Sequence, residues 1–178
     1  MPEVEKRFVE IYLNDHLAGA SAVRALARRM ARSLSDPADR EVLSKMLGDI
    51  EADGRALRTI MRSLDVPVAR RRIAAGWAAE KLGRLKPNGR LVKRSPLSDL
   101  VEIEALSSGV SADLAGWTVL RDLAETTPRL DPGELDRLIG RAEGRLVRLD
   151  RLHRRVGSAV LVGREGTGKV RAGGRLSA

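Results

Sequence analysis

Apolar residues recur along two stretches of this chain at the spacing of an amphipathic α-helix. In residues 43–64, intervals of mostly three and four residues bring the large apolar side chains onto one face: Leu43, Met46, Leu47, Ile50, Leu57, Ile60, Met61 and Leu64. Residues 135–156 carry a second such stripe: Leu135, Leu138, Ile139, Ala142, Leu146, Leu149, Leu152 and Val156. Each stripe predicts a helix that buries one face in a shared core.

Two Asp-Pro pairs mark where these two helices begin. Asp36 and Asp131 fit the N-cap position, where a side-chain oxygen accepts a hydrogen bond from a free backbone N–H. Pro37 and Pro132 fit the first helical position, because proline has no N–H to lose there. We therefore expect helices that begin at residues 37 and 132, the second of which ends near Val156.

A further helix is predicted before them, over residues 3–34. One of its faces is rich in arginine and the opposite side is apolar, with Ile11, Tyr12, Ala22, Val23, Leu26 and Met30. Only a few residues separate this helix from the one that begins at Pro37. The two helices are therefore expected to lie side by side and antiparallel.

The helix predicted after Ser95-Pro96, which ends near Ala124, is apolar on two sides. One side carries Leu97, Leu100, Val101 and Ala115, and the other carries Ile103, Leu106, Val110, Leu114 and Trp117. A helix of this kind is expected to be buried on both sides. We expect Leu106 and Trp117 to be buried, either by the preceding segment or by a second subunit.

That preceding segment, residues 66–95, is too long for a simple turn. Pro67 opens a run of good helix formers over residues 70–85, and the sequence Lys86-Pro87-Asn88-Gly89 ends it. The predicted fold is all-α: a four-helix bundle over residues 1–156, built from two antiparallel hairpins that a long helical crossover joins. Residues 157–178 are rich in glycine and basic residues, which predicts a flexible tail.

Composition narrows the class of protein. The 178 residues include no cysteine, which rules out disulfides and thiolate metal sites. We predict a cytoplasmic protein without a membrane span, because the N-terminus lacks an apolar signal region and no apolar run approaches about 20 residues. Aromatic residues make up 2% of the chain, which counts against a single-strand nucleic-acid binder.

The formal net charge of +9 has two interpretations. The favoured one is solvated helix faces, because the arginines recur around the backs of helices. The alternative is a site for nucleic acid or another anionic surface, for which Arg70, Arg71 and Arg72 are the candidate residues.

Three local strings carry a family resemblance: residues 12–19 (YLNDHLAG), 75–81 (AGWAAEK) and 95–104 (SPLSDLVEIE). With the predicted helical plan, they resemble the ferritin-like superfamily over residues 4–156, and most closely its small bacterial stress-associated proteins and an actinobacterial set. Metal-active members place a Glu on each of two helices and Glu-x-x-His on each of the other two. This chain departs from that pattern. The motif requires a histidine three residues after the Glu, but Gly54 stands there after Glu51 and Leu146 stands there after Glu143.

Four ionisable residues fall near the predicted apolar faces: His16, Asp53, Glu104 and His153. Counted from the hairpin loops, His16 is level with Asp53, and Glu104 is level with His153. We expect two polar pairs about 20 Å apart, at a rise of about 1.5 Å per residue. Two pairs so far apart cannot hold one ion, so structural contacts are favoured over a metal site.

The leading hypothesis for function is a non-enzymatic ferritin-like bundle without a cofactor, a scaffold or stress-related interaction module that forms a homodimer through the third-helix and crossover surface. The second hypothesis is a divergent iron or manganese carboxylate protein, with the candidate ligands His16, Asp53, Glu102, Glu104 and His153. The third is a basic protein that binds nucleic acid or anionic surfaces. A protein partner also fits the first hypothesis.

Overall fold

The computed structural model describes residues 3–69 and 96–162 of the chain. These residues form four α-helices and no strand: α1 (Glu3–Ser33), α2 (Pro37–Ser63), α4 (Pro96–Leu123) and α5 (Pro132–Leu161). The prediction of an all-α fold is confirmed. None of the described helices is long and apolar enough to cross a membrane.

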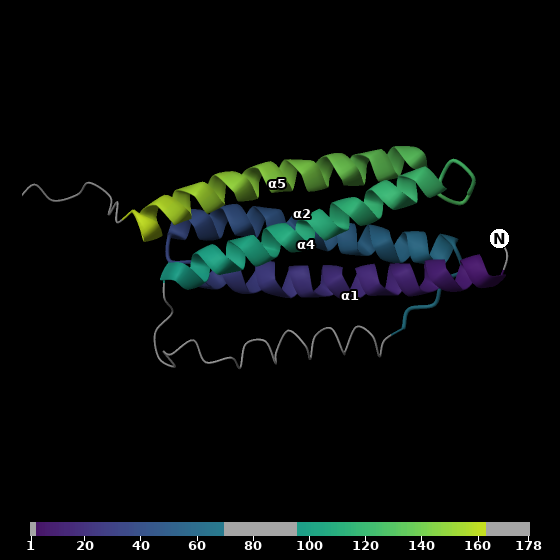
Figure 1. Cartoon of the computed structure of the whole chain (residues 1–178), viewed down its shortest axis with the longest axis horizontal. Helices are drawn as coiled ribbons and strands as arrows, with labels where there is room; N and C mark the ends of the chain where they lie inside the picture. The colour runs from purple at the N-terminus through teal and green to yellow at the C-terminus, as the bar shows by residue number, and fades with distance from the viewer. Residues whose placement is uncertain (1–2, 70–95, 163–178) are drawn as a thin grey trace, which may run out of the picture.

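The four helices pack as a ring in which each helix contacts two others. The contacting pairs are α1 with α2, α4 with α5, α1 with α4, and α2 with α5. Figure 1 shows that α2 returns alongside α1, and that α5 returns alongside α4. The predicted crossover helix, with Arg70, Arg71, Arg72 and Trp77, lies outside the described residues.

Both predicted N-caps are present. The Asp36 Oδ1 atom accepts a hydrogen bond from the Ala38 N–H at 2.8 Å, and Asp131 Oδ1 accepts one from the Gly133 N–H at 2.9 Å. Each cap satisfies a backbone donor that the first helical turn leaves free. These two local signals therefore fix where α2 and α5 begin.

The helix α5 is longer than the sequence pattern predicts. It continues through Gly157 to Leu161, past the expected end near Val156. Gly157 lies against α4, where an added Cβ would stand 3.6 Å from the Leu100 side chain, and Val160 packs against the core. Burial against α4 thus outweighs the low helix propensity of this glycine. The later part of the predicted tail, residues 163–178, lies outside the described residues.

A buried aspartate fastens the start of α4 to the link between α1 and α2. The Asp99 Oδ2 atom accepts hydrogen bonds from the Ser35 N–H at 2.9 Å and from the Ser35 hydroxyl at 2.7 Å. The Asp99 residue is 4% exposed. This contact joins the first pair of helices to the second pair at one end of the bundle.

The core lies along the middle of the ring, and α4 is only partly enclosed by it. Leu106 and Trp117 are buried, as predicted. The other apolar side of α4 is different: Leu100 is buried, but Leu97, Val101, Ala115 and Val119 are exposed. The described helices therefore leave apolar surface of α4 uncovered.

Candidate functional site: polar residues between the four helices

Each helix contributes one ionisable residue near its middle to a connected polar group: His16 from α1, Asp53 from α2, Asp113 from α4 and Arg145 from α5. Asp53 and Arg145 form an ion pair. The charge of Asp113 interacts with the charges of both. His16 and Asp113 line the same groove between α1 and α4. We call these four residues the polar centre.

The Arg145 guanidinium is buried in the bundle and binds Asp53 through Nη2. A second arginine, Arg141, forms an ion pair with Asp53 Oδ1 at 2.7 Å, although its orientation falls short of a hydrogen bond. The Arg145 Nε and Nη1 atoms are buried and find no acceptor among the described residues. A buried charge of this kind is stable only when an opposite charge accompanies it.

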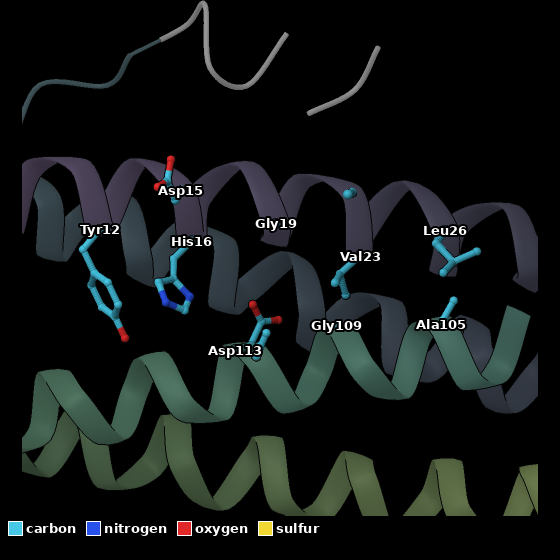
Figure 2. Close-up of a pocket in the computed structure, with 11 residues that line it drawn as sticks. Tyr12, Asp15, His16, Gly19, Val23, Leu26, Ala105, Gly109 and Asp113 are labelled. Carbon is cyan, nitrogen blue, oxygen red and sulfur yellow. The ribbon is translucent and has the colours of Figure 1, made fainter. Parts of the chain in front are cut away.

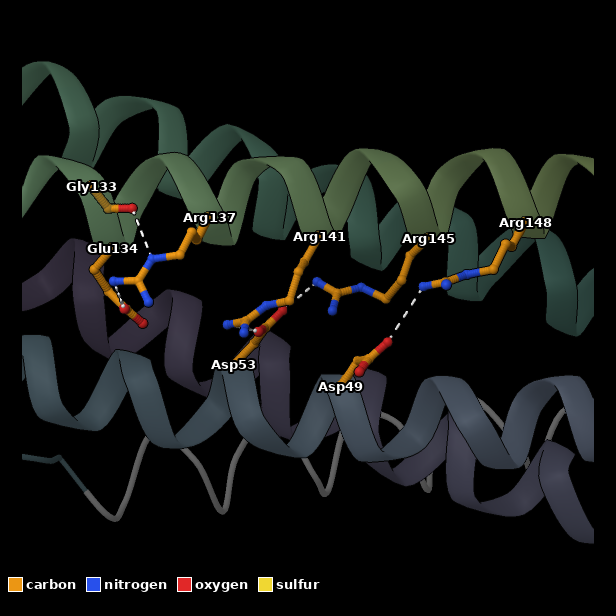
Figure 3. Close-up of polar contacts among 8 residues, drawn as sticks. All are labelled: Asp49, Asp53, Gly133, Glu134, Arg137, Arg141, Arg145 and Arg148. Carbon is orange, nitrogen blue, oxygen red and sulfur yellow. Dashed lines mark hydrogen bonds and ion pairs between the residues drawn. The ribbon is translucent and has the colours of Figure 1, made fainter.

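Further arginines of α5 extend this contact along α2. Arg148 reaches Asp49 with 3.4 Å between Nη2 and Oδ2, and Arg155 reaches the buried Asp39. Figure 3 shows Arg141, Arg145 and Arg148 extending from α5 toward the aspartates of α2. Burial raises the pKa of Asp39, and Arg155 opposes that rise. Because Arg145 is buried, the expectation that the arginines are solvated is wrong for this residue.

On the other side of the polar centre, His16 lies against α4. Its ring centroid is 4.4 Å from that of Tyr12, and a Cβ added to Gly116 would come within 2.7 Å of the His16 Cε1 atom. Only a glycine leaves room for the ring at this position. Burial lowers the pKa of His16, and the negative charge of Asp15 opposes that change.

Asp113 faces His16 from α4, as Figure 2 shows. Burial raises the pKa of Asp113 to about 7, while Arg145 acts to lower it and Asp53 to raise it. Asp113 makes no hydrogen bond or ion pair with the residues that the structure describes. It is thus an acid that changes its charge near neutral pH at the edge of the core.

The predicted pair of His16 and Asp53 does not form. Asp53 turns toward α5, where it binds Arg145 and Arg141, whereas the His16 ring packs against Gly116 of α4. Counting residues from the hairpin loop places both at one level of the bundle, and both do belong to the polar centre. Their side chains contact different neighbours. The physical reason is that arginine offers Asp53 a permanent positive charge, which neutral histidine does not.

The predicted pair of Glu104 and His153 is confirmed. The Glu104 Oε1 and His153 Nε2 atoms are 3.0 Å apart, and both side chains are about half exposed. Glu102 pairs elsewhere, with Arg29 of α1, at 3.1 Å. The five candidate metal ligands are therefore divided among separate contacts, and only Glu104 and His153 share one within the described residues. No three His, Cys, Asp or Glu residues gather in a way that could hold a metal within residues 3–69 and 96–162.

Two residues of the polar centre, Asp113 and Arg145, were missed by sequence reasoning. A signal for both exists in the spacing. Arg145 lies three residues after Ala142 and four before Leu149, and Asp113 lies three after Val110 and four before Trp117. Each is therefore a charged residue at a position of the buried face, which requires a partner of opposite charge nearby.

Comparisons of this chain with protein-family models, with curated proteins and with solved structures found no match.

Proposed function

We propose that this chain is a non-enzymatic, ferritin-like helical bundle, a scaffold or interaction module that forms a homodimer through α4. The observation that carries the proposal is the exposed apolar surface of that helix. Four exposed residues, Leu97, Val101, Ala115 and Val119, lie four or fourteen residues apart along the helix, so they share one face. We call this face the α4 stripe.

The α4 stripe suits contact with a second helix. Val101 and Val119 are 53% and 49% exposed, and the small residue Ala115 lies between them on the same face. Small residues let two helix backbones approach closely, while the valines bury apolar area at about 25 cal/mol per Å². In a homodimer each α4 stripe would cover its own copy, since a two-fold interface uses the same patch on both subunits.

The ferritin-like part of the proposal rests on the helical plan. Four helices in a ring, with a long connection over residues 64–95 between the second and third described helices, correspond to that architecture. The non-enzymatic part rests on charge. Asp53, the carboxylate of α2 in the polar centre, is already paired with two arginines. A positive guanidinium takes the place next to this carboxylate that a metal ion would require.

Sedimentation velocity of the full chain tests the assembly. We expect a dimer, and we expect Val101→Asp to convert it to a monomer by burying an unpaired charge at the interface. The matched control is Val147→Asp on α5, where the native side chain is also 53% exposed. A wild-type chain that stays monomeric at all concentrations, or a dimer that survives Val101→Asp, would contradict the homodimer.

Elemental analysis tests the absence of metal chemistry. The purified chain, incubated with iron or manganese and then desalted, is expected to retain far less than one ion per chain. A stoichiometric ion that is lost in Asp53→Asn would instead support the di-metal hypothesis.

A further inference from the structure

The groove between α1 and α4 has a polar inner end and apolar walls. Its volume is about 540 Å³, within the range of about 300–1,000 Å³ that is common for small-molecule sites. Tyr12, His16 and Asp113 form the polar end, and Gly19, Val23 and Ala105 belong to the apolar part (Figure 2). The groove therefore has the shape and lining of a site for a small amphipathic molecule.

The charge of the groove is opposite to the charge of the chain. Apart from Asp15, which has a partner of its own, the ionisable residues of its lining are Asp113, Tyr12 and His16, and no Lys or Arg belongs to the lining among the described residues. Asp113 is the inner carboxylate and has no hydrogen-bond or ion-pair partner within the described ranges. In a protein of net charge +9, this local negative charge selects a cationic group.

A second observation points to an occupant at the same end. Trp117 is 4% exposed, and its indole N–H is buried without an acceptor among the described residues. Trp117 lines a cavity of about 10 Å³ whose walls include Tyr12, His16 and Asp113, the polar end of the groove. That volume is about the space of one water molecule. A buried donor without an acceptor costs free energy, which a bound water would recover.

We infer that this groove binds a small primary amine with an apolar body, whose ammonium group pairs with Asp113 and whose hydrocarbon lies between Val23 and Ala105. The Tyr12 ring at the same end adds an aromatic face that attracts cations. A water in the inner cavity accepts a hydrogen bond from the Trp117 N–H and a second from the ammonium group. This arrangement uses the Asp113 carboxylate, the Tyr12 ring and the Trp117 N–H.

Binding is measured with hexylamine, hexanol and hexanoate on the full chain. The variant Trp77→Phe leaves Trp117 as the sole tryptophan, so that its fluorescence reports the inner end of the groove. Titrations at pH 8 keep Asp113 ionised, above its pKa of about 7. We expect saturable binding of hexylamine, weaker binding of hexanol and none of hexanoate. Calorimetry on the wild-type chain repeats the series without the tryptophan substitution.

Two pairs of variants assign the site. Asp113→Asn is expected to weaken hexylamine binding about 10- to 100-fold, the loss of a charge-assisted hydrogen bond, while Glu104→Gln on the same helix leaves it unchanged. Gly19→Leu fills the groove and is expected to abolish binding of the amine and the alcohol. An added Cβ at Gly19 meets nothing within 4 Å, and the same holds for Gly48 on α2, so Gly48→Leu is the matched control.

The proposal is overturned if the wild-type chain does not bind hexylamine, if hexanoate binds as well as hexylamine, or if Asp113→Asn keeps full affinity. If Asp113→Asn does not fold, Gly19→Leu decides, because retained amine binding in that variant places the amine outside the groove.

Discussion

The Arg145 guanidinium of α5 binds the Asp53 carboxylate of α2 inside the bundle, where the two side chains are 1% and 6% exposed. Each charge is costly to remove from water, and each depends on the other for compensation. Removing one partner of this ion pair is therefore expected to lower the stability of the fold more than removing one partner of any other described contact between α2 and α5.

Arg145→Leu is expected to lower the free energy of unfolding by about 3–5 kcal/mol, because it leaves a buried carboxylate with the partly exposed Arg141 alone. Adding Asp53→Leu should recover part of the loss, since the second substitution removes the unpaired charge. Urea unfolding of both single variants and the double variant measures the coupling. Arg148→Leu is the control: its pair with Asp49 is about half exposed and should be worth less than about 1 kcal/mol. Equal effects of Arg145→Leu and Arg148→Leu would contradict the prediction.

Asp113→Asn should change how stability depends on pH. The ordinary pKa of this carboxyl is 3.8, and the fold raises it to about 7. Between these values the folded chain holds a proton that the unfolded chain has released, so this residue lowers stability as the pH rises toward 7. Relative to wild type, Asp113→Asn should therefore gain roughly 1–3 kcal/mol between pH 4 and pH 8.

Urea unfolding across that pH range measures the gain. The charges that act on Asp113 are those of Asp53 on α2 and Arg145 on α5, while His16 and Asp15 of α1 line the same groove, and the substitution keeps all four residues. Burial lowers the pKa of His16, so His16 makes the fold less stable as the pH falls; burial and Asp15 set this shift and both proteins keep them, so the effect cancels in the comparison. A pH-independent difference between the two proteins would show that Asp113 titrates normally.

Gly116→Ala should destabilise the bundle, because the added methyl group would stand 2.7 Å from the His16 ring. An overpacked core position typically costs about 1–3 kcal/mol. Combining it with His16→Ala should remove the clash and reduce this cost. Gly144→Ala on α5 meets nothing within 4 Å and should stabilise its helix by about 0.5–1 kcal/mol. Thermal unfolding of the three variants compares these signs, and a stabilising Gly116→Ala would contradict the position of the ring.

Trp117→Ala should cost roughly 3–5 kcal/mol, since it removes a buried aromatic side chain from the core. In the Val101→Asp background, in which the proposed homodimer is absent, Val119→Ala on the exposed side of α4 should change stability by less than about 0.5 kcal/mol. Chemical denaturation of both variants tests which side of α4 faces the core. Similar costs at the two positions would mean that a further surface covers the α4 stripe.

The sequence predicts what depends on neighbours along the chain. The starts of α2 and α5 follow from Asp-Pro pairs, because a cap acts within three residues of itself. The pair of Glu104 and His153 follows from counting along one hairpin, whose two helices are held at a fixed level by their loop. Both inferences need only local geometry.

Contacts between the two pairs of helices are harder to predict. Counting residues gives the height of His16 and Asp53 along the bundle but not the direction in which each side chain points. That direction depends on which face of α1 meets α4 and which face of α2 meets α5. The arginines were a further difficulty, because the same spacing describes a solvated row and a row that binds aspartates on a neighbouring helix.

The contact of Asp99 with Ser35 has a consequence for register. Long helices with apolar faces of uniform character can slide past one another by one turn, about 5.4 Å, at little cost in buried area. Asp99 accepts two hydrogen bonds from Ser35 in the link between α1 and α2, and the Asp99 residue is buried. A slide of α4 by one turn would break both bonds and separate that carboxylate from Ser35. The contact therefore selects one axial register of the α4–α5 pair relative to the α1–α2 pair.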